Sequence, residues 1–194
     1  MISDEVLYFE EYREEENTRA VLDLVRRKAE ELGIRSIVIA STRGKVAELA
    51  LEYLDPSKYN LVVVTHSSWF RPELKQEFSE EVRRKLIEKG VKVVTAALAF
   101  GGIDKAVVAK YGFSPGQLIA DVLRLFCEGV KVAVEIVLMA TDAGYLEPGE
   151  KVISVAGTVK GADTALVVKA APSRRMFELR ILRILAKPLY SRPG

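Results

Sequence analysis

The chain has 194 residues and a mass of 21.5 kDa, and 49% of its residues are hydrophobic, which suits one domain with an ordinary core. Its 29 Lys and Arg residues nearly balance its 27 Asp and Glu residues, so the net charge of +2 gives no general attraction to nucleic acid. With one cysteine, Cys127, and one histidine, His66, the chain offers neither an internal disulfide nor a Cys/His zinc site.

We expect the protein to be cytoplasmic and to make no membrane contact. The first sixteen residues are acidic and lack the features of a signal peptide, and no apolar run approaches the roughly 20 residues of a membrane span. Scarce Asn, Gln and Met beside abundant Glu, Lys, Arg and Val indicate a thermophilic source. A homo-oligomer is expected on general grounds for such a small thermophilic protein.

Helix and strand patterns alternate through the first half of the chain. Apolar residues at helical spacing, between a cap at Asn17 and Thr18 and a stop at Gly33, predict a helix over residues 18–32. A short β-branched run predicts a buried strand at 36–40, followed by a helix over 45–54. The unit recurs as a strand at 61–65, a helix over 73–89 and a third strand at 91–95.

The second half is less regular until Ser114-Pro115, which predicts the start of a helix that reaches about residue 127. The apolar run at 130–143 suits a buried strand by composition, but its length and the following Gly144 favour a helix. Strands are predicted at 151–156 and 164–170. The gap between them is too short for a helical crossover, so they should be antiparallel neighbours, with an amphipathic tail at about 174–185 packed against the sheet.

These elements predict a single α/β domain over residues 1–194. Buried strands separated by helices favour a three-layer α/β/α arrangement with right-handed crossovers. The expected sheet has five strands, is mixed but mostly parallel, and has an antiparallel last strand.

The first candidate ligand site follows the first strand. Ligands of open α/β sheets bind at the carboxyl ends of the strands, where loops lead into helix starts. Two hydroxyls, a glycine and two cations stand there and suit a phosphate, although neither a Walker A motif nor GxGxxG is present. The alternative is an ordinary helix cap with solvated cations. The residues are Ser41, Thr42, Arg43, Gly44 and Lys45.

The second strand ends in Thr65 and His66, at the same edge of the sheet. His66 could contact a ligand or be a structural histidine. A hydrolytic triad with a neighbouring serine is the weakest interpretation, because no G-x-S-x-G elbow is present and the sequence identifies no acid to orient the ring. Trp69 and Phe70 could stack on a planar ring or pack on the core.

The third candidate segment is the small-residue loop at 157–163. Small residues let a ligand approach the backbone, but a hairpin loop also uses glycines. The candidate ligand-binding residues are Gly157, Thr158, Gly161, Ala162 and Asp163. Two acids, Glu135 and Asp142, have open roles, and Glu135 would need a partner if buried.

The sequence resembles the carboxy-terminal α/β domain of pyruvate kinase, and more closely the stand-alone archaeal and bacterial proteins built as that domain alone. The resemblance rests on Ile-Val-Ile-Ala-Ser-Thr-Arg-Gly-Lys at 37–45, Val-Val-Val-Thr-His at 62–66, Pro-Gly-Glu-Lys-Val-Ile-Ser-Val-Ala-Gly-Thr at 148–158 and Gly-Ala-Asp-Thr-Ala at 161–165. In pyruvate kinase this domain carries no catalysis and, in many members, binds a phosphorylated sugar through loops that correspond here to 41–45 and 158–163.

The stand-alone relatives bind flavin mononucleotide (FMN) in the same cleft, so the resemblance implies a small phosphorylated ligand, FMN first. Its phosphate would lie on residues 41–45, with His66 and the 157–163 loop lining the rest. Redox catalysis is left open, and no catalytic residue or metal is assigned. The alternative is a non-catalytic sensor of a phosphorylated sugar or nucleotide. The pyruvate kinase reaction is excluded, because 194 residues cannot hold a (β/α)₈ barrel as well as this domain.

Overall fold

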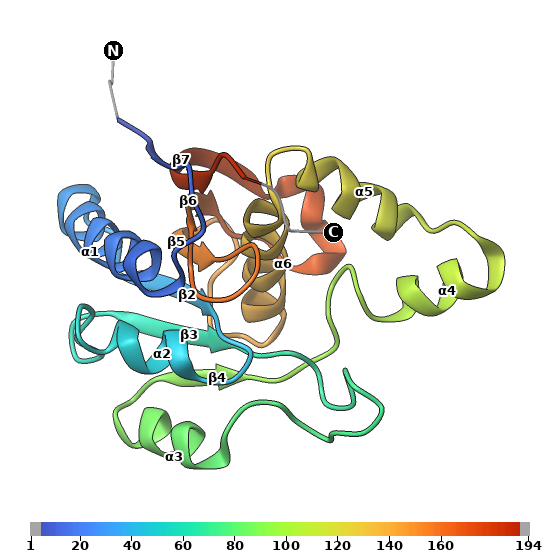
Figure 1. The fold of residues 1–194 in the computed structure, drawn as a ribbon, viewed down its shortest axis with the longest axis horizontal. Coiled ribbons are helices and arrows are strands. Elements are labelled where there is room, and N and C mark those ends of the chain that lie inside the picture. Colours follow the sequence, from blue (N-terminus) through green and yellow to red (C-terminus); the bar gives the residue numbers. More distant parts are fainter. Residues whose placement is uncertain (1–4, 191–194) are drawn as a thin grey trace.

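A seven-stranded sheet with helices on both faces makes up the computed structural model, which describes residues 5–190 (Figure 1). The strand order is β1-β7-β6-β5-β2-β3-β4. Only β6 runs against its neighbours, and every other described pairing is parallel. The strands are β1 (Leu7–Phe9), β2 (Ser36–Ala40), β3 (Asn60–Val64), β4 (Lys92–Val94), β5 (Lys151–Ala156), β6 (Thr164–Lys169) and β7 (Arg180–Pro188).

The predicted α/β class and mostly parallel sheet are confirmed, and the five predicted strands are all present. Two further strands, β1 and β7, extend the sheet. The tail expected to pack against the sheet forms a short 3-10 turn, η1 (Ser173–Glu178), and then β7, which is inserted between β6 and β1. The physical reason is that β6 would otherwise expose an unpaired edge, which β7 covers with backbone hydrogen bonds.

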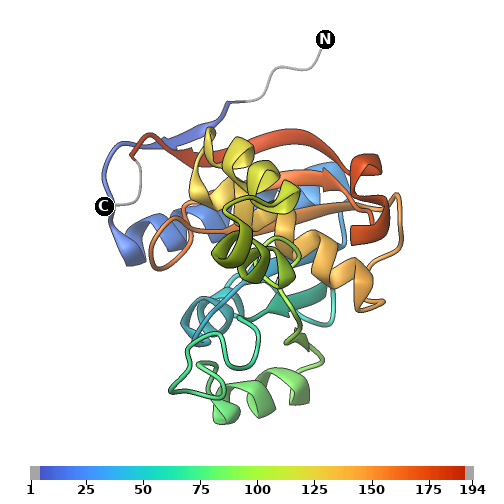
Figure 2. The ribbon, with the colours of Figure 1, turned by 90° about the vertical axis from the view of Figure 1, so that its right-hand side faces the viewer.

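The helices form two layers. α1 (Glu14–Leu32), α2 (Lys45–Ala50) and α3 (Glu80–Glu88) pack on one face, over a core that includes Leu22, Ile39 and Leu86. α5 (Pro115–Arg124) and α6 (Glu128–Asp142) lie on the other face, as Figure 2 shows. α4 (Ile103–Tyr111) contacts α5 and has no buried residue. The domain is therefore a three-layer α/β/α sandwich.

Two helix starts differ from the sequence prediction. α1 begins at Glu14, so Asn17 and Thr18 are buried inside its first turns rather than capping it. α3 begins at Glu80, not at residue 73, because Ser79 caps it by accepting the N–H of Val82. Residues 66–79 therefore form a long loop after β3, and this loop carries the only histidine.

The ambiguous apolar run at 130–143 is helical, as predicted. α6 is buried almost along its whole length because it lies between the sheet and the segments that cover it. A helix covered on most sides needs apolar residues on most sides, which is why its composition also fits a buried strand. Its amino end points to the edge where β5 ends, since α6 leads directly into β5.

Candidate functional site

Strands β2 and β5 are parallel neighbours, with Ile39 opposite Val155. From β2 the chain proceeds to β3 and β4 on one side, whereas β5 lies on the other side of β2. This reversal of strand order is the position at which open α/β sheets place their ligands. The loops that leave β2 and β5, residues 41–44 and 157–163, therefore emerge side by side at one edge of the sheet. Two of the three segments predicted from the sequence meet there.

Ser41 anchors the loop after β2 to the end of β3 and to α2. This buried residue donates its N–H to the carbonyl oxygen of Val64 at 3.0 Å, and its hydroxyl accepts the N–H of Ala47 at 3.3 Å. Gly44 has a φ of 104°, and a β-carbon there would lie 2.8 Å from Cγ1 of Val82. Ser41 and Gly44 thus set the shape of the loop, and a side chain at position 44 would strain the backbone and force Val82 to shift.

Arg43 is the cation that this loop leaves free. It is exposed and has no hydrogen bond or ion pair with any residue in the described range 5–190. Lys45 is engaged instead: its Nζ lies 2.9 Å from Oε1 of Glu14. That hydrogen bond lowers the pKa of Glu14 and raises the pKa of Lys45.

The backbone of the same loop also offers hydrogen-bond donors. Among the described residues, none accepts a hydrogen bond from the N–H of Gly44, Lys45 or Val46. α2 has six residues, so these local donors and Arg43, rather than a long helix dipole, are what the loop presents to an anion.

The glycines of the 157–163 loop are explained by close packing of the protein on itself. A β-carbon at Gly157 would lie 2.2 Å from the carbonyl oxygen of Gly161, and one at Gly161 would lie 2.4 Å from Oγ1 of Thr18. The same threonine hydroxyl accepts the N–H of Ala162 at 2.9 Å. The loop is therefore held against α1, which accounts for these residues without a ligand.

The buried carboxylate of Asp163 holds the two ends of this loop together. It is 2% exposed, and its carboxylate accepts the N–H of Thr158 at 3.0 Å, the hydroxyl of Thr164 at 2.7 Å and the hydroxyl of Tyr190 at 3.1 Å. Asn17 in turn donates to the Tyr190 oxygen at 3.2 Å. With its carboxylate shared by three donors, Asp163 fixes the loop rather than facing a ligand.

Thr158 is the exception in this network. The residue is 4% exposed, and its hydroxyl is the buried side-chain polar atom that finds no hydrogen-bond partner among residues 5–190. A buried hydroxyl without a partner is costly, so Thr158 is a candidate for contact with a polar atom from outside the chain. It lies just after β5, beside the loop that carries Arg43.

The two residues after β3 have different roles. Thr65 is 2% exposed, and its hydroxyl bonds the Thr95 hydroxyl at 2.7 Å and the His66 carbonyl at 2.8 Å. Thr65 is therefore used internally. The His66 ring is partly exposed, and its Nε2 lies 3.4 Å from Oγ1 of Thr42. His66 thereby connects the loop after β3 to the loop after β2, as predicted for residues at one sheet edge.

Sequence reasoning missed Glu77. Its Oε2 lies 2.8 Å from Nδ1 of His66, its Oε1 lies 3.1 Å from Nε of Arg71, and its side chain is 5% exposed. Phe70 stacks on the His66 ring, with 4.0 Å between the ring centroids. A helix was predicted from residue 73, so no pattern in the sequence indicated that residue 77 folds back onto residue 66.

The two acids with open roles are both partnered. Glu135 is 3% exposed, pairs with the Nζ of Lys131 one turn earlier in α6, and accepts the N–H of Phe100 at 2.8 Å. Asp142 accepts the N–H of Ser173 at 2.9 Å and so ties the end of α6 to η1. Both contacts are within the fold.

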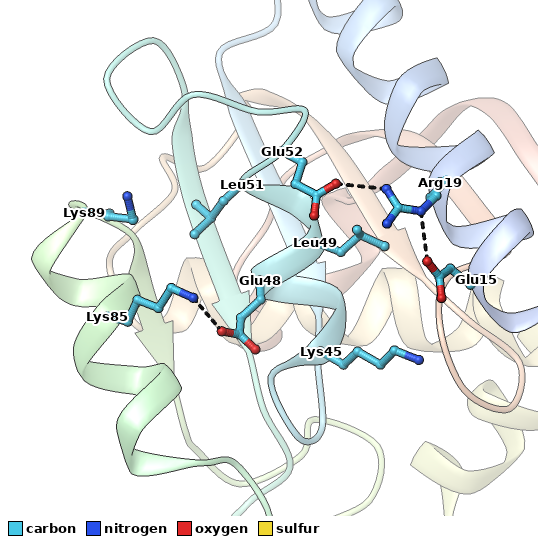
Figure 3. Close-up of a pocket in the computed structure, with 9 residues that line it drawn as sticks. All are labelled: Glu15, Arg19, Lys45, Glu48, Leu49, Leu51, Glu52, Lys85 and Lys89. Atoms are coloured by element: carbon cyan, nitrogen blue, oxygen red, sulfur yellow. Dashed lines mark hydrogen bonds and ion pairs between the residues drawn. The ribbon is translucent and has the colours of Figure 1, made fainter.

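An open groove of about 500 Å³ lies between α1, α2 and α3, and Lys45 is one of the residues that line it (Figure 3). Most of its charges are paired: Arg19 with Glu15 and Glu52, Lys85 with Glu48, and Lys45 with Glu14. Lys89 has no ion pair with a residue in the described range. The loop after β2 differs from the groove because free N–H groups lie beside its unpaired cation. A much smaller crevice nearby is lined by both Lys45 and Gly161, so the two predicted loops also approach each other on this side.

No group of three or more His, Cys, Asp and Glu side chains within residues 5–190 could hold a metal ion. None of the helices formed by these residues is long and apolar enough to cross a membrane.

The fold is a three-layer α/β/α domain whose strand order reverses between β5 and β2. The chain matches the family model "Pyruvate kinase, alpha/beta domain" over residues 19–168, and it belongs to that family. The resemblance seen in the sequence is thereby confirmed at the level of the domain.

Similar solved structures are whole pyruvate kinases. One, from Cryptosporidium parvum, is 18% identical, with a TM-score of 0.38, and the match covers 73% of this chain and 21% of that chain. Another is the Cryptosporidium parvum enzyme in complex with ADP, at 18% identity and a TM-score of 0.41, covering 79% of this chain and 24% of that chain. The chain thus spans less than a quarter of the length of these enzymes.

Proposed function

We propose that the protein binds a small phosphorylated ligand, FMN first, at the sheet edge where the loops after β2, β3 and β5 meet. The observation that carries the proposal is a chain of contacts. Thr42 in the candidate phosphate loop contacts His66 at 3.4 Å, and the His66 ring stacks on Phe70 at 4.0 Å. A phosphate loop is thus joined to an aromatic surface, and FMN needs both.

The residues present fit the two ends of FMN. The unpaired Arg43 and the free N–H groups of residues 44–46 would hold the phosphate, and the unpartnered Thr158 hydroxyl would donate to a polar atom of the ligand. Phe70 and Trp69, which are 39% and 63% exposed, offer a flat wall to the ring. When bound, FMN supplies hydride and single-electron transfer. Any redox activity of the protein would depend on this ligand.

The alternative is a non-catalytic sensor of a phosphorylated sugar or nucleotide. The hydroxyls of Thr42 and Thr158 favour it, because a sugar needs hydroxyl and charged partners more than an aromatic wall. Both ligand classes share the phosphate, so they share Arg43 and differ in their need for Phe70.

The experiment is a visible absorption spectrum of the purified protein, taken before and after incubation with excess FMN and removal of the free ligand. A retained band at about 450 nm supports the flavin proposal. If no band is retained, a thermal-shift screen of phosphorylated sugars and nucleotides tests the sensor. Phe70→Ala separates the two, because it should release flavin but leave the binding of a sugar phosphate nearly unchanged.

A further inference from the structure

The imidazole of His66 faces a hydroxyl group. Its Nε2 lies 3.4 Å from Oγ1 of Thr42, and this is the only hydrogen bond that the Thr42 side chain makes with residues 5–190. The His66 side chain is 34% exposed, so reagents can approach the pair. In a structure without a bound substrate, a nucleophile and its base are often this far apart and close up when the substrate binds.

Glu77 determines which nitrogen of His66 is the base. A carboxylate only accepts hydrogen bonds, so the 2.8 Å contact between Oε2 and Nδ1 places the ring proton on Nδ1 when the imidazole is neutral. Nε2, facing Thr42, is then left with its lone pair. The second carboxylate oxygen is held 3.1 Å from Nε of Arg71, which fixes the acid as well as the ring.

The loop around His66 holds the ring in place, and one residue of this loop, Trp69, has a strained backbone conformation. Gln76 donates its side-chain amide to the His66 carbonyl at 3.1 Å, and Phe70 covers one face of the ring. Trp69, in the same loop, has a φ of 61° and is the only non-glycine residue with positive φ in the described range. Strain of this kind concentrates at functional sites.

The charged groups around the imidazole are few. Glu77 and, through it, Arg71 face Nδ1, and Lys105 lies 5.6 Å from the centroid of the Phe70 ring that covers His66. On the Nε2 side, Thr42 is followed by the unpaired Arg43 and by the free N–H of Gly44. The loop that bears the hydroxyl thus also carries donors for a developing oxyanion.

We propose that Thr42 is an acyl-accepting nucleophile, that His66 is its general base, and that Glu77 is the positioning residue. The substrate class is a carboxylic ester. Thr42 Oγ bonds to the carbonyl carbon, its proton passes to His66 Nε2, the bond to the alcohol oxygen breaks, and that oxygen takes the proton from His66. Water then attacks the acyl carbon, its proton passes through His66 to Thr42, and the carboxylic acid leaves.

The proposal does not rest on phosphate binding, and its test uses p-nitrophenyl acetate, which carries no phosphate. The full chain is mixed with this ester, p-nitrophenolate release is followed, and the quenched protein is mapped by peptide mass spectrometry. We expect a burst and one acetyl group on Thr42. Thr42→Val should abolish the burst and Thr42→Ser should retain it. Ser57→Ala, which removes an exposed hydroxyl before β3, should change nothing.

The roles of His66 and Glu77 are tested by measuring the acetylation rate of variants at each position. His66→Gln should slow acetylation by roughly 10² to 10⁴-fold. Glu77→Gln should slow it strongly, because an amide can donate to Nδ1 and leave the proton on Nε2, whereas Glu77→Asp should restore part of the rate. If Glu77 were only structural, both substitutions would lower the melting temperature, and Glu77→Gln and Glu77→Asp would not differ in acetylation rate. Acetyl groups on lysines alone, or an unchanged burst in Thr42→Val, would overturn the proposal. Should Thr42→Val not fold, the peptide map of the unaltered protein decides.

Discussion

Tyr190 donates its hydroxyl hydrogen to Oδ2 of Asp163 over 3.1 Å, and this contact joins the segment that follows β7 to the loop that follows β5. The same carboxylate oxygen accepts the N–H of Thr158, so the position of the last strand and the shape of the candidate ligand loop are set by one side chain. Tyr190, two residues after β7, therefore links the end of that strand to the candidate site.

The first prediction concerns alkaline pH. Burial first, and the negative charge of Asp163 second, raise the pKa of Tyr190 above its ordinary value of 10.0. Because the folded-state pKa is raised, the stability from this group is fully present below pH about 10 and is lost as the pH rises through the folded pKa. Urea unfolding between about pH 9 and 11 should show a steeper loss in the unaltered protein than in Tyr190→Phe. Equal slopes would contradict this.

The second prediction compares two glycines with similar backbone angles. Gly161 and Gly33 have φ values of 72° and 64°, but a β-carbon at Gly33 meets nothing within 4 Å, whereas one at Gly161 meets Thr18 and Glu14 at 2.4 and 2.7 Å. Gly33→Ala should cost about 1 kcal/mol of unfolding free energy from strain alone. Gly161→Ala should cost at least about 2 kcal/mol more. Urea denaturation measures both, and similar losses would show that the loop does not pack on α1.

The third prediction tests the buried ion pair of α6. Lys131→Met leaves the Glu135 carboxylate buried without its cation, which should cost roughly 3–5 kcal/mol. In Lys131→Met/Glu135→Gln, the amide oxygen still accepts the N–H of Phe100 and carries no charge. The double variant should therefore be more stable than the single one in urea unfolding. A double variant no more stable than Lys131→Met would mean that the charge of Glu135 is not the source of the cost.

The sheet was largely predictable because its central strands are buried on both faces. Continuous apolar runs such as residues 37–39 and 62–64 are typical of parallel strands buried on both faces, and the parallel direction predicted that the loops after these strands emerge at one edge. β7 was not predictable in the same way. Its residues are partly exposed and amphipathic, and only the unpaired edge of β6 makes them a strand.

The site was predictable only as a set of loops. His66 could be placed at the sheet edge from the strand before it, and its contact with Thr42 follows from the neighbouring strands. Glu77 could not be placed, because residues 66–79 have no period and their conformation depends on tertiary contacts such as that with Arg71. The internal use of Asp163 and of the loop glycines likewise depends on Thr18 and Tyr190, far away in the sequence.

The proposed site places the phosphate of FMN on Arg43 and the loop after β2. The most direct measurement is a titration of the protein with FMN, followed by quenching of flavin fluorescence, in the unaltered chain and in two matched variants. Arg43→Glu changes the exposed cation after β2, and Arg35→Glu makes the same change just before β2, at the opposite edge of the sheet.

We expect saturable FMN binding that Arg43→Glu weakens by about tenfold or more, as the loss of a charge-assisted hydrogen bond predicts. Arg35→Glu should stay within about twofold of the unaltered protein, because it leaves the loop intact. No saturable binding, or equal affinities for Arg43→Glu and Arg35→Glu, would contradict the assignment of the phosphate to this loop.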